Sequence, residues 1–280
     1  EGVHPVSDAC NFARFCSNLD FFAITDHAEW LTRREWKDTI SSIQNCASTS
    51  SDLDNPPIIP LLGWEWTQKS ITKSNHYGHK NVILRSIEND AIPLRPIGAE
   101  GKFFESLLRI PISNMLGASL YDFKNRQNYF NFRHRKLITE NLNRCSADVA
   151  VRDLPDDCIE RAITPEVLFN KLDDWGYDSM VIPHGTAWGN TAPPLAAWDT
   201  QLNKKNHNPD YQKLIELYSG HGNPEEYRSW RTLNITKDNI LSCPQPSPGF
   251  TPECYQAGEI IRERCRVSAG SIEECDKRAR

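Results

Sequence analysis

The sequence predicts an α/β fold in which short buried strands alternate with capped helices. Apolar runs that are rich in branched or aromatic residues and bounded by Gly, Pro or a charge are typical of buried strands. Such runs occupy residues 20–25, 58–63, 179–183 and 214–218. Helix-start signals follow or precede them, so that strand, polar residue, loop and helix form a repeating unit. This repeat is typical of an α/β barrel or of a layered α/β sheet.

Three segments carry helix-start signals, in which a Thr or Asn caps the first turn and Glu or Pro follows. These starts are Thr32 with Glu35, Thr164 with Pro165, and Asn223 with Pro224. Gly176 lies where the second of these helices is expected to end, because glycine readily adopts the left-handed conformation that ends many helices. Ser271 opens a further expected helix that runs to the end of the chain.

The bulk composition fits one large globular domain. The chain has 280 residues, of which 39% are hydrophobic and 25% charged, and a net charge of −5. This charge gives no help to non-specific nucleic-acid binding, and no apolar run approaches the roughly 20 residues of a membrane span. We therefore expect neither a nucleic-acid partner nor a membrane span in this segment. Because the chain opens at Glu1 and stops inside an expected helix, we expect it to be truncated at both ends.

Two segments, at about 85–163 and about 243–280, stand apart from the repeating unit within the single predicted domain, residues 1–280. The first, from about residue 85 to about residue 163, shows weak periodicity and is predicted to be an insertion. Within them, the basic and aromatic run at 123–136 favours an exposed helix with solvated charges. The alternative is an anion-binding segment in which three arginines grip a substrate. These are Arg126, Arg133 and Arg135.

The nine cysteines are a high number for a cytosolic enzyme. Four of them are spaced almost evenly within a Cys- and Pro-rich segment at about 243–280, namely Cys243, Cys254, Cys265 and Cys275. This spacing favours disulfides, and hence a periplasmic or secreted protein, over buried free thiols. A zinc cluster is disfavoured because the chain has no C-x2-C pair.

Polar residues recur where the predicted strands end, which is where chemistry collects in an α/β barrel. His27 follows the first run, Glu65 lies between two tryptophans after the second, and His184 and His221 follow the last two, each before a glycine. His76 and His79 precede another expected strand, at residues 80–84. Histidines and a glutamate at one face would form a site for divalent metals. Each residue alone also fits a structural role, such as a buried ion pair for the glutamate.

Five strings in the chain resemble a known family. They are Ile24-Thr-Asp-His27, Leu62-Gly-Trp-Glu-Trp-Thr-Gln68, Asn75-His-Tyr-Gly-His-Lys-Asn-Val82, Ile182-Pro-His-Gly-Thr-Ala-Trp-Gly189 and Tyr218-Ser-Gly-His-Gly-Asn-Pro-Glu225. Together they are similar to the polymerase-and-histidinol-phosphatase (PHP) superfamily and, within it, to the bacterial DUF3604 family, over essentially the whole chain. The resemblance implies a distorted (β/α)7 TIM-like barrel that holds two or three Zn, Mn or Fe ions and most often hydrolyses phosphoesters.

The resemblance also implies roles for single residues. Glu65 matches a glutamate that bridges two metals, and the matched histidine ligands are His27, His79 and His184. His221 matches a position of the narrower family and would ligate a metal or donate a proton. Independently of the resemblance, Asp26 would orient a histidine or only cap its loop, and His76 is a secondary candidate ligand because it lies three residues before His79. The superfamily's His-x-His and Asp-x-His pairs do not occur in this chain, and we expect them beyond its two ends.

The favoured hypothesis is a metal-dependent hydrolase of the phosphoesterase type. Its metals would lower the pKa of a bound water, supply hydroxide as the nucleophile, and act on a small anionic substrate. The alternative is a barrel that binds a metal or a ligand without catalysis. A nucleic-acid partner for the basic segment is disfavoured, because the chain is acidic and carries no recognisable binding motif.

Overall fold

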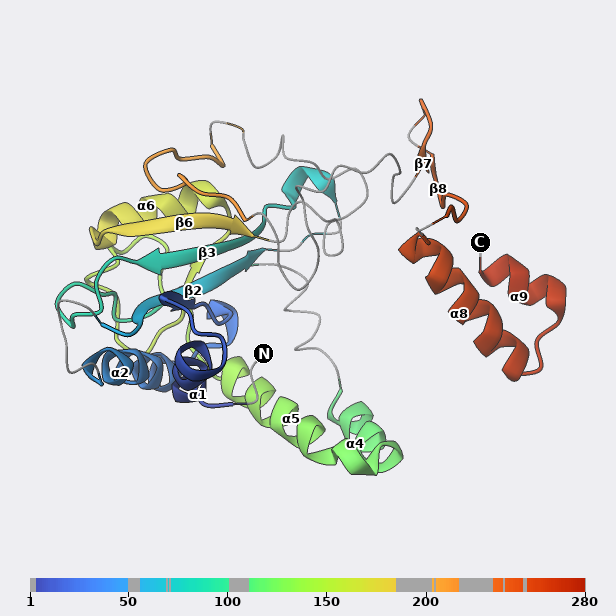
Figure 1. The fold of residues 1–280 in the computed structure, drawn as a ribbon, viewed down its shortest axis with the longest axis horizontal. Coiled ribbons are helices and arrows are strands. Elements are labelled where there is room, and N and C mark those ends of the chain that lie inside the picture. The colour runs from blue at the N-terminus through green and yellow to red at the C-terminus, as the bar shows by residue number, and fades with distance from the viewer. Residues whose placement is uncertain are drawn as a thin grey trace. The chain divides into compact units, whose positions relative to one another are not determined.

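The computed structural model of the protein describes residues 4–49, 56–68, 70, 72–100, 111–184, 203, 205–216, 234–238, 240–248 and 251–279 (Figure 1). The chain divides into two compact units, Glu1–Asn223 and Pro224–Arg280, which are described separately.

The first unit combines a mixed sheet with helices. Its strands are β1 (Phe21–Ile24), β2 (Ile59–Gln68), β3 (Gly78–Leu84), β4 (Ile97–Ala99), β5 (Glu160–Ala162) and β6 (Ser179–His184). Its α-helices are α1 (Val6–Asn11), α2 (Arg33–Ser48), α4 (Ile112–Tyr121), α5 (Arg126–Glu140) and α6 (Pro165–Trp175). A π-helical turn at Phe12–Cys16 and short 3-10 turns at Ala28–Trp30 (η2), Lys73–Asn75 (η3) and Phe123–Asn125 (η4) complete it. The α/β class is therefore confirmed.

Four strands form the main sheet in the order β1-β2-β3-β6, and Figure 1 shows β2, β3 and β6 side by side. β1 is parallel to β2, whereas β3 is antiparallel to both β2 and β6. β4 and β5 form a separate parallel pair. Over the described part of the chain, the strands do not close into a barrel.

The direction of β3 differs from the repeated parallel unit that the sequence predicts. Residues 69–77 connect β2 to β3, fewer than the dozen or more that a parallel crossover needs. The chain therefore turns back on itself and pairs β3 antiparallel to β2. β6, which follows the helix α6, pairs antiparallel with β3 and so runs in the same direction as β2.

The expected strand at residues 214–218 is wrong over its described part, residues 214–216, which have no regular structure. Leu214 and Ile215 are exposed rather than buried. Residues 211–216 still run beside β6, because Val181 N–H donates to the Tyr211 carbonyl and Glu216 N–H donates to the Pro183 carbonyl. These two bonds hold the segment to the sheet without forming a ladder.

The helix-start predictions are confirmed wherever they fall on described residues. Thr32 and Glu35 form a complete capping box at the start of α2, and Thr164 caps α6 by accepting a hydrogen bond from the Val167 N–H. Gly176 ends α6 with a φ of 68°, the left-handed conformation that glycine allows. The helix start expected at 223–224 lies outside the described residues.

The second unit contains a short hairpin and two helices. Its elements are β7 (Asn234–Ile235), β8 (Leu241–Ser242), α8 (Glu253–Val267) and α9 (Ile272–Arg278). Ser271 caps α9 by accepting a hydrogen bond from the Glu274 N–H. Arg262 of α8 pairs with Asp276 of α9 at 2.7 Å. Covalent bonds also hold these elements together, because each helix carries a cysteine that is bonded to another part of the unit.

Eight of the nine cysteines form disulfides, and the ninth, Cys16, is free and exposed. The bonds are Cys10–Cys46, Cys145–Cys158, Cys243–Cys254 and Cys265–Cys275. The last two confirm the disulfides predicted from the even spacing, and the first two join cysteines 36 and 13 residues apart in the sequence. Four disulfides are consistent with an oxidising compartment.

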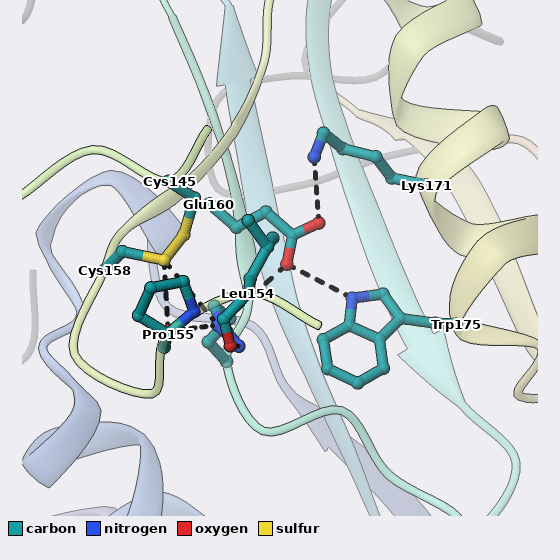
Figure 2. The surroundings of a disulfide bond; sticks show 8 residues. Cys145, Leu154, Pro155, Cys158, Glu160, Lys171 and Trp175 are labelled. Atoms are coloured by element: carbon teal, nitrogen blue, oxygen red, sulfur yellow. Dashed lines mark hydrogen bonds and ion pairs between the residues drawn. A yellow bond between two sulfur atoms is a disulfide. The ribbon is translucent and has the colours of Figure 1, made fainter. Parts of the chain in front are cut away.

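A buried carboxylate lies beside the Cys145–Cys158 disulfide, as Figure 2 shows. Glu160 is fully buried and accepts hydrogen bonds from Lys171 Nζ at 3.1 Å and from Trp175 Nε1 at 3.2 Å. Burial raises the pKa of Glu160, and its cationic neighbours offset only part of that effect. Glu160 thus joins β5 to α6 at the cost of burying a carboxyl group.

We predict that Glu160→Leu lowers the free energy of unfolding by about 2–4 kcal/mol, because it leaves the Lys171 ammonium and the Trp175 N–H without their acceptor. Urea denaturation measures this change. Asp178→Asn is the control, because it breaks an exposed ion pair with Arg85 and should cost no more than about 1 kcal/mol. Equal losses in the two variants would contradict a stabilising role for Glu160.

A second prediction concerns the cysteines. Thiol titration of the protein in denaturant without reductant should find one thiol per chain, because only Cys16 is free. Peptide mapping under non-reducing conditions should recover the four disulfide-linked pairs. Several free thiols in protein purified from an oxidising compartment would contradict this connectivity.

Candidate metal centre

Three side chains from three neighbouring strands converge at one edge of the main sheet. Glu65 lies in β2, His79 lies at the start of β3, and His184 ends β6. In the register of the sheet, His79 lies opposite Thr67 on one side and opposite His184 on the other. Because β3 is antiparallel to its neighbours, its first residues share an edge with the last residues of β2 and β6. One ligand atom from each of the three lies within 4.8 Å of the other two.

Glu65 is the centre of this group. Its Oε1 atom accepts a hydrogen bond from the Thr67 hydroxyl at 2.7 Å and contacts Nδ1 of His79. Its Oε2 atom lies 4.0 Å from Nε2 of His184. Burial by itself would raise the pKa of Glu65. The hydrogen bond from His79 and the charges of His27 and His79 outweigh burial and lower that pKa to about 2, so the carboxylate stays ionised.

His27 lies beside the group of three, three residues beyond the end of β1. Its Nδ1 atom is 2.7 Å from the Thr67 hydroxyl and 3.5 Å from Oε1 of Glu65. The Glu65 N–H donates to the carbonyl of Asp26 at 2.9 Å, which extends the β1–β2 pairing to this point. The structure therefore places His27 beside the centre and gives Asp26 a backbone contact with Glu65.

Two acceptors at the centre were missed in the sequence analysis. The Glu216 carboxylate lies 2.6 Å from Nδ1 of His184, and the Thr67 hydroxyl joins Glu65 to His27. Strand periodicity could have found Thr67, because residues two apart in a strand share a face. The signal for Glu216 was a lone acid within the apolar run at 214–218.

His76 and His221 are the remaining histidines that the sequence predicts for the site. His76 is buried, and its Nδ1 atom accepts a hydrogen bond from the Ser70 N–H at 3.3 Å. It is not a member of the group formed by Glu65, His79 and His184. His221 lies outside the described residues.

The predicted substrate-binding arginines lie on α5, and two of them make local contacts. Arg126 stacks on the Phe123 ring and donates to its carbonyl. Arg135 pairs with Glu35 and donates to the Trp30 carbonyl at 2.9 Å, so it links α5 to the start of α2. Arg133 is half-buried on the same helix. The helix expected over residues 123–136 is confirmed as a 3-10 turn at Phe123–Asn125 followed by α5.

The chemistry of the three donors fits a divalent metal ion. One carboxylate and two imidazoles make up the protein ligands of some catalytic zinc sites, which leave a position for water or substrate. In a tetrahedral site with metal–ligand bonds of about 2.0–2.2 Å, two ligand atoms lie about 3.3–3.6 Å apart. The ligand atoms here lie within 4.8 Å of one another, so the most distant pair would close by at most about 1–1.5 Å around an ion.

Comparison with protein-family models, with curated proteins and with solved structures finds no match to the chain. Among the described helices, none is long and apolar enough to cross a membrane. The geometry of the centre and the sequence motifs therefore carry the functional argument.

Proposed function

We propose that the chain is a metal-dependent hydrolase domain of the PHP type that acts on phosphoesters or related anionic esters. The observation that carries this proposal is the convergence of Glu65, His79 and His184 at one sheet edge. The proposal includes the TIM-like barrel and the two or three Zn, Mn or Fe ions that the family resemblance implies. The four disulfides support a periplasmic or secreted location.

Each residue has a separate task in this proposal. Glu65, His79 and His184 would hold a metal, with His27 beside them, and Glu216 would orient His184. A divalent ion, when bound, lowers the pKa of a water molecule and stabilises charge on the oxygens of an ester. His221 would bind a metal or protonate the leaving group, and Asp26 would orient a histidine.

The binding of an anionic substrate is assigned to arginines of α5. Arg126, an exposed residue, is the better candidate, together with the half-buried Arg133. Arg135 is already paired with Glu35, so substrate binding there would require this ion pair to break.

A second candidate function is a barrel that binds a metal without catalysis. The observation that favours it is the absence of His-x-His and Asp-x-His from the sequence, since these pairs complete the metal set of the family. Metal content together with ester hydrolysis separates the two functions. Bound metal without turnover of phosphate or sulfate esters would favour the second.

We expect the purified protein to contain metal and Glu65→Ala to contain much less, because the variant removes the carboxylate at the middle of the centre. Inductively coupled plasma mass spectrometry after incubation with Zn or Mn measures both. Glu88→Ala, which removes an exposed carboxylate elsewhere, should match the unaltered protein. An unaltered protein that stays metal-free after incubation would refute the proposed function.

A further prediction concerns the carboxylate behind His184. Glu216→Gln should weaken zinc binding about 10–100-fold, because an amide accepts the His184 N–H less strongly than a carboxylate does. Competition with a chelating dye measures the affinity, and Glu88→Gln is the matched control. Equal affinities in all three proteins would show that Glu216 does not support the metal site.

A further inference from the structure

The hydroxyl of Thr67 bridges two side chains of the candidate centre. Its Oγ1 atom lies 2.7 Å from Oε1 of Glu65 and 2.7 Å from Nδ1 of His27. A hydroxyl has one proton to donate, whereas an ionised carboxylate can only accept. The Thr67 proton therefore goes to Glu65. The short contact with His27 is then a hydrogen bond only if Nδ1 of His27 carries a proton and donates it.

We propose that Thr67 is a positioning residue that fixes His27 in the Nδ1–H tautomer, in which Nε2 is the nitrogen able to bind a metal. The proposal rests on the metal-dependent function for the identity of the ligand, whereas the tautomer is argued from the two hydrogen bonds of the Thr67 hydroxyl. A metal-binding imidazole needs such an acceptor on its other nitrogen, because the acceptor sets both the tautomer and the ring orientation.

Hydrogen bonds through the buried Glu29 fix the position of Thr67. Its backbone N–H donates to Oε1 of Glu29 at 3.0 Å, and the same oxygen accepts a hydrogen bond from the Ala99 N–H. Arg161 in turn donates to the backbone carbonyl of Glu29 at 3.1 Å. Thr67 and Glu29 are both buried. The hydroxyl therefore sits on a strand whose position is fixed from η2, β4 and β5, as a positioning group requires.

The same proton count applies to His184. Its Nδ1 atom faces the Glu216 carboxylate at 2.6 Å, which can only accept, while its Nε2 atom faces Glu65 at 4.0 Å. His76 shows the opposite arrangement, because its Nδ1 atom accepts from the Ser70 N–H and its proton therefore lies on Nε2. The chain thus contains an internal reference for each tautomer.

Long-range ¹H–¹⁵N correlation spectra of protein labelled with ¹⁵N-histidine test the proposal, because they distinguish the two tautomers of each imidazole. In metal-free protein in mildly alkaline buffer, we expect Nδ1–H for His27 and His184 and Nε2–H for His76. In Thr67→Val, which replaces the hydroxyl by a methyl group of similar size, His27 should become a mixture of tautomers. His76 and His184 should stay unchanged, which reports that the fold is intact.

Thr67→Ser is the conservative variant, because it keeps the hydroxyl. It should retain the Nδ1–H tautomer of His27, and its zinc affinity should stay close to that of the unaltered protein. Thr67→Val should bind zinc about tenfold or more weakly, within the range found when the groups that orient metal ligands are removed. A loss common to Val and Ser variants would indicate a packing role and overturn the proposal.

The wild-type spectrum alone can overturn the inference, whether or not any variant folds. A proton on Nε2 of His27 would contradict it, and so would an unchanged His27 in a folded Thr67→Val variant. Failure of the metal-dependent function gives a different result, in which His27 is in the Nδ1–H form and zinc does not bind. That result refutes the metal centre and still supports the positioning of His27 by Thr67.

Discussion

The antiparallel pairing of β3 between β2 and β6 is the constraint on which the candidate centre depends. Side chains directly opposite each other in antiparallel strands lie about 4.5–5.5 Å apart at their Cβ atoms. This spacing places His79 next to Thr67 on one side and His184 on the other, and Glu65, diagonally across from His79, is still within reach of its side chain. A slip of one residue would move every side chain of β3 to the other face of the sheet. The buried faces of β2 and β3 set the register and thereby assemble the centre.

Burial disfavours the ionised form of three carboxyl groups in this fold, but their pKa values do not all shift in the same direction. Burial dominates at Glu29 and Glu160, and the pKa of each is raised despite cationic neighbours. At Glu65, hydrogen bonds and histidines reverse the effect of burial, and the pKa falls to about 2. The first two join elements of the fold. Glu65 remains an ionised carboxylate among histidines, which is the state that a cation needs.

The sequence could predict the features that depend on neighbouring residues. The Thr32 cap and the Gly176 helix end follow from local chemistry, and the structure confirms them. The direction of β3 follows from the pairing of whole strands and from a short connection. The partnership of Glu216 with His184 depends on a segment that lies beside β6 without being a strand. Long-range pairing of this kind leaves little trace in the local pattern, so the residues that orient the histidines were missed.

Charge balance at the centre bears on the choice of substrate. The chain carries a net charge of −5, so its overall field repels anions. Two neutral imidazoles and one carboxylate around a divalent ion leave a local charge of one positive unit. Glu216 lies outside this group, but its carboxylate faces Nδ1 of His184 and adds a negative charge one imidazole away. Under the proposed function, an anionic ester would therefore have to bind the ion directly, because neither the overall field nor the local charge attracts it.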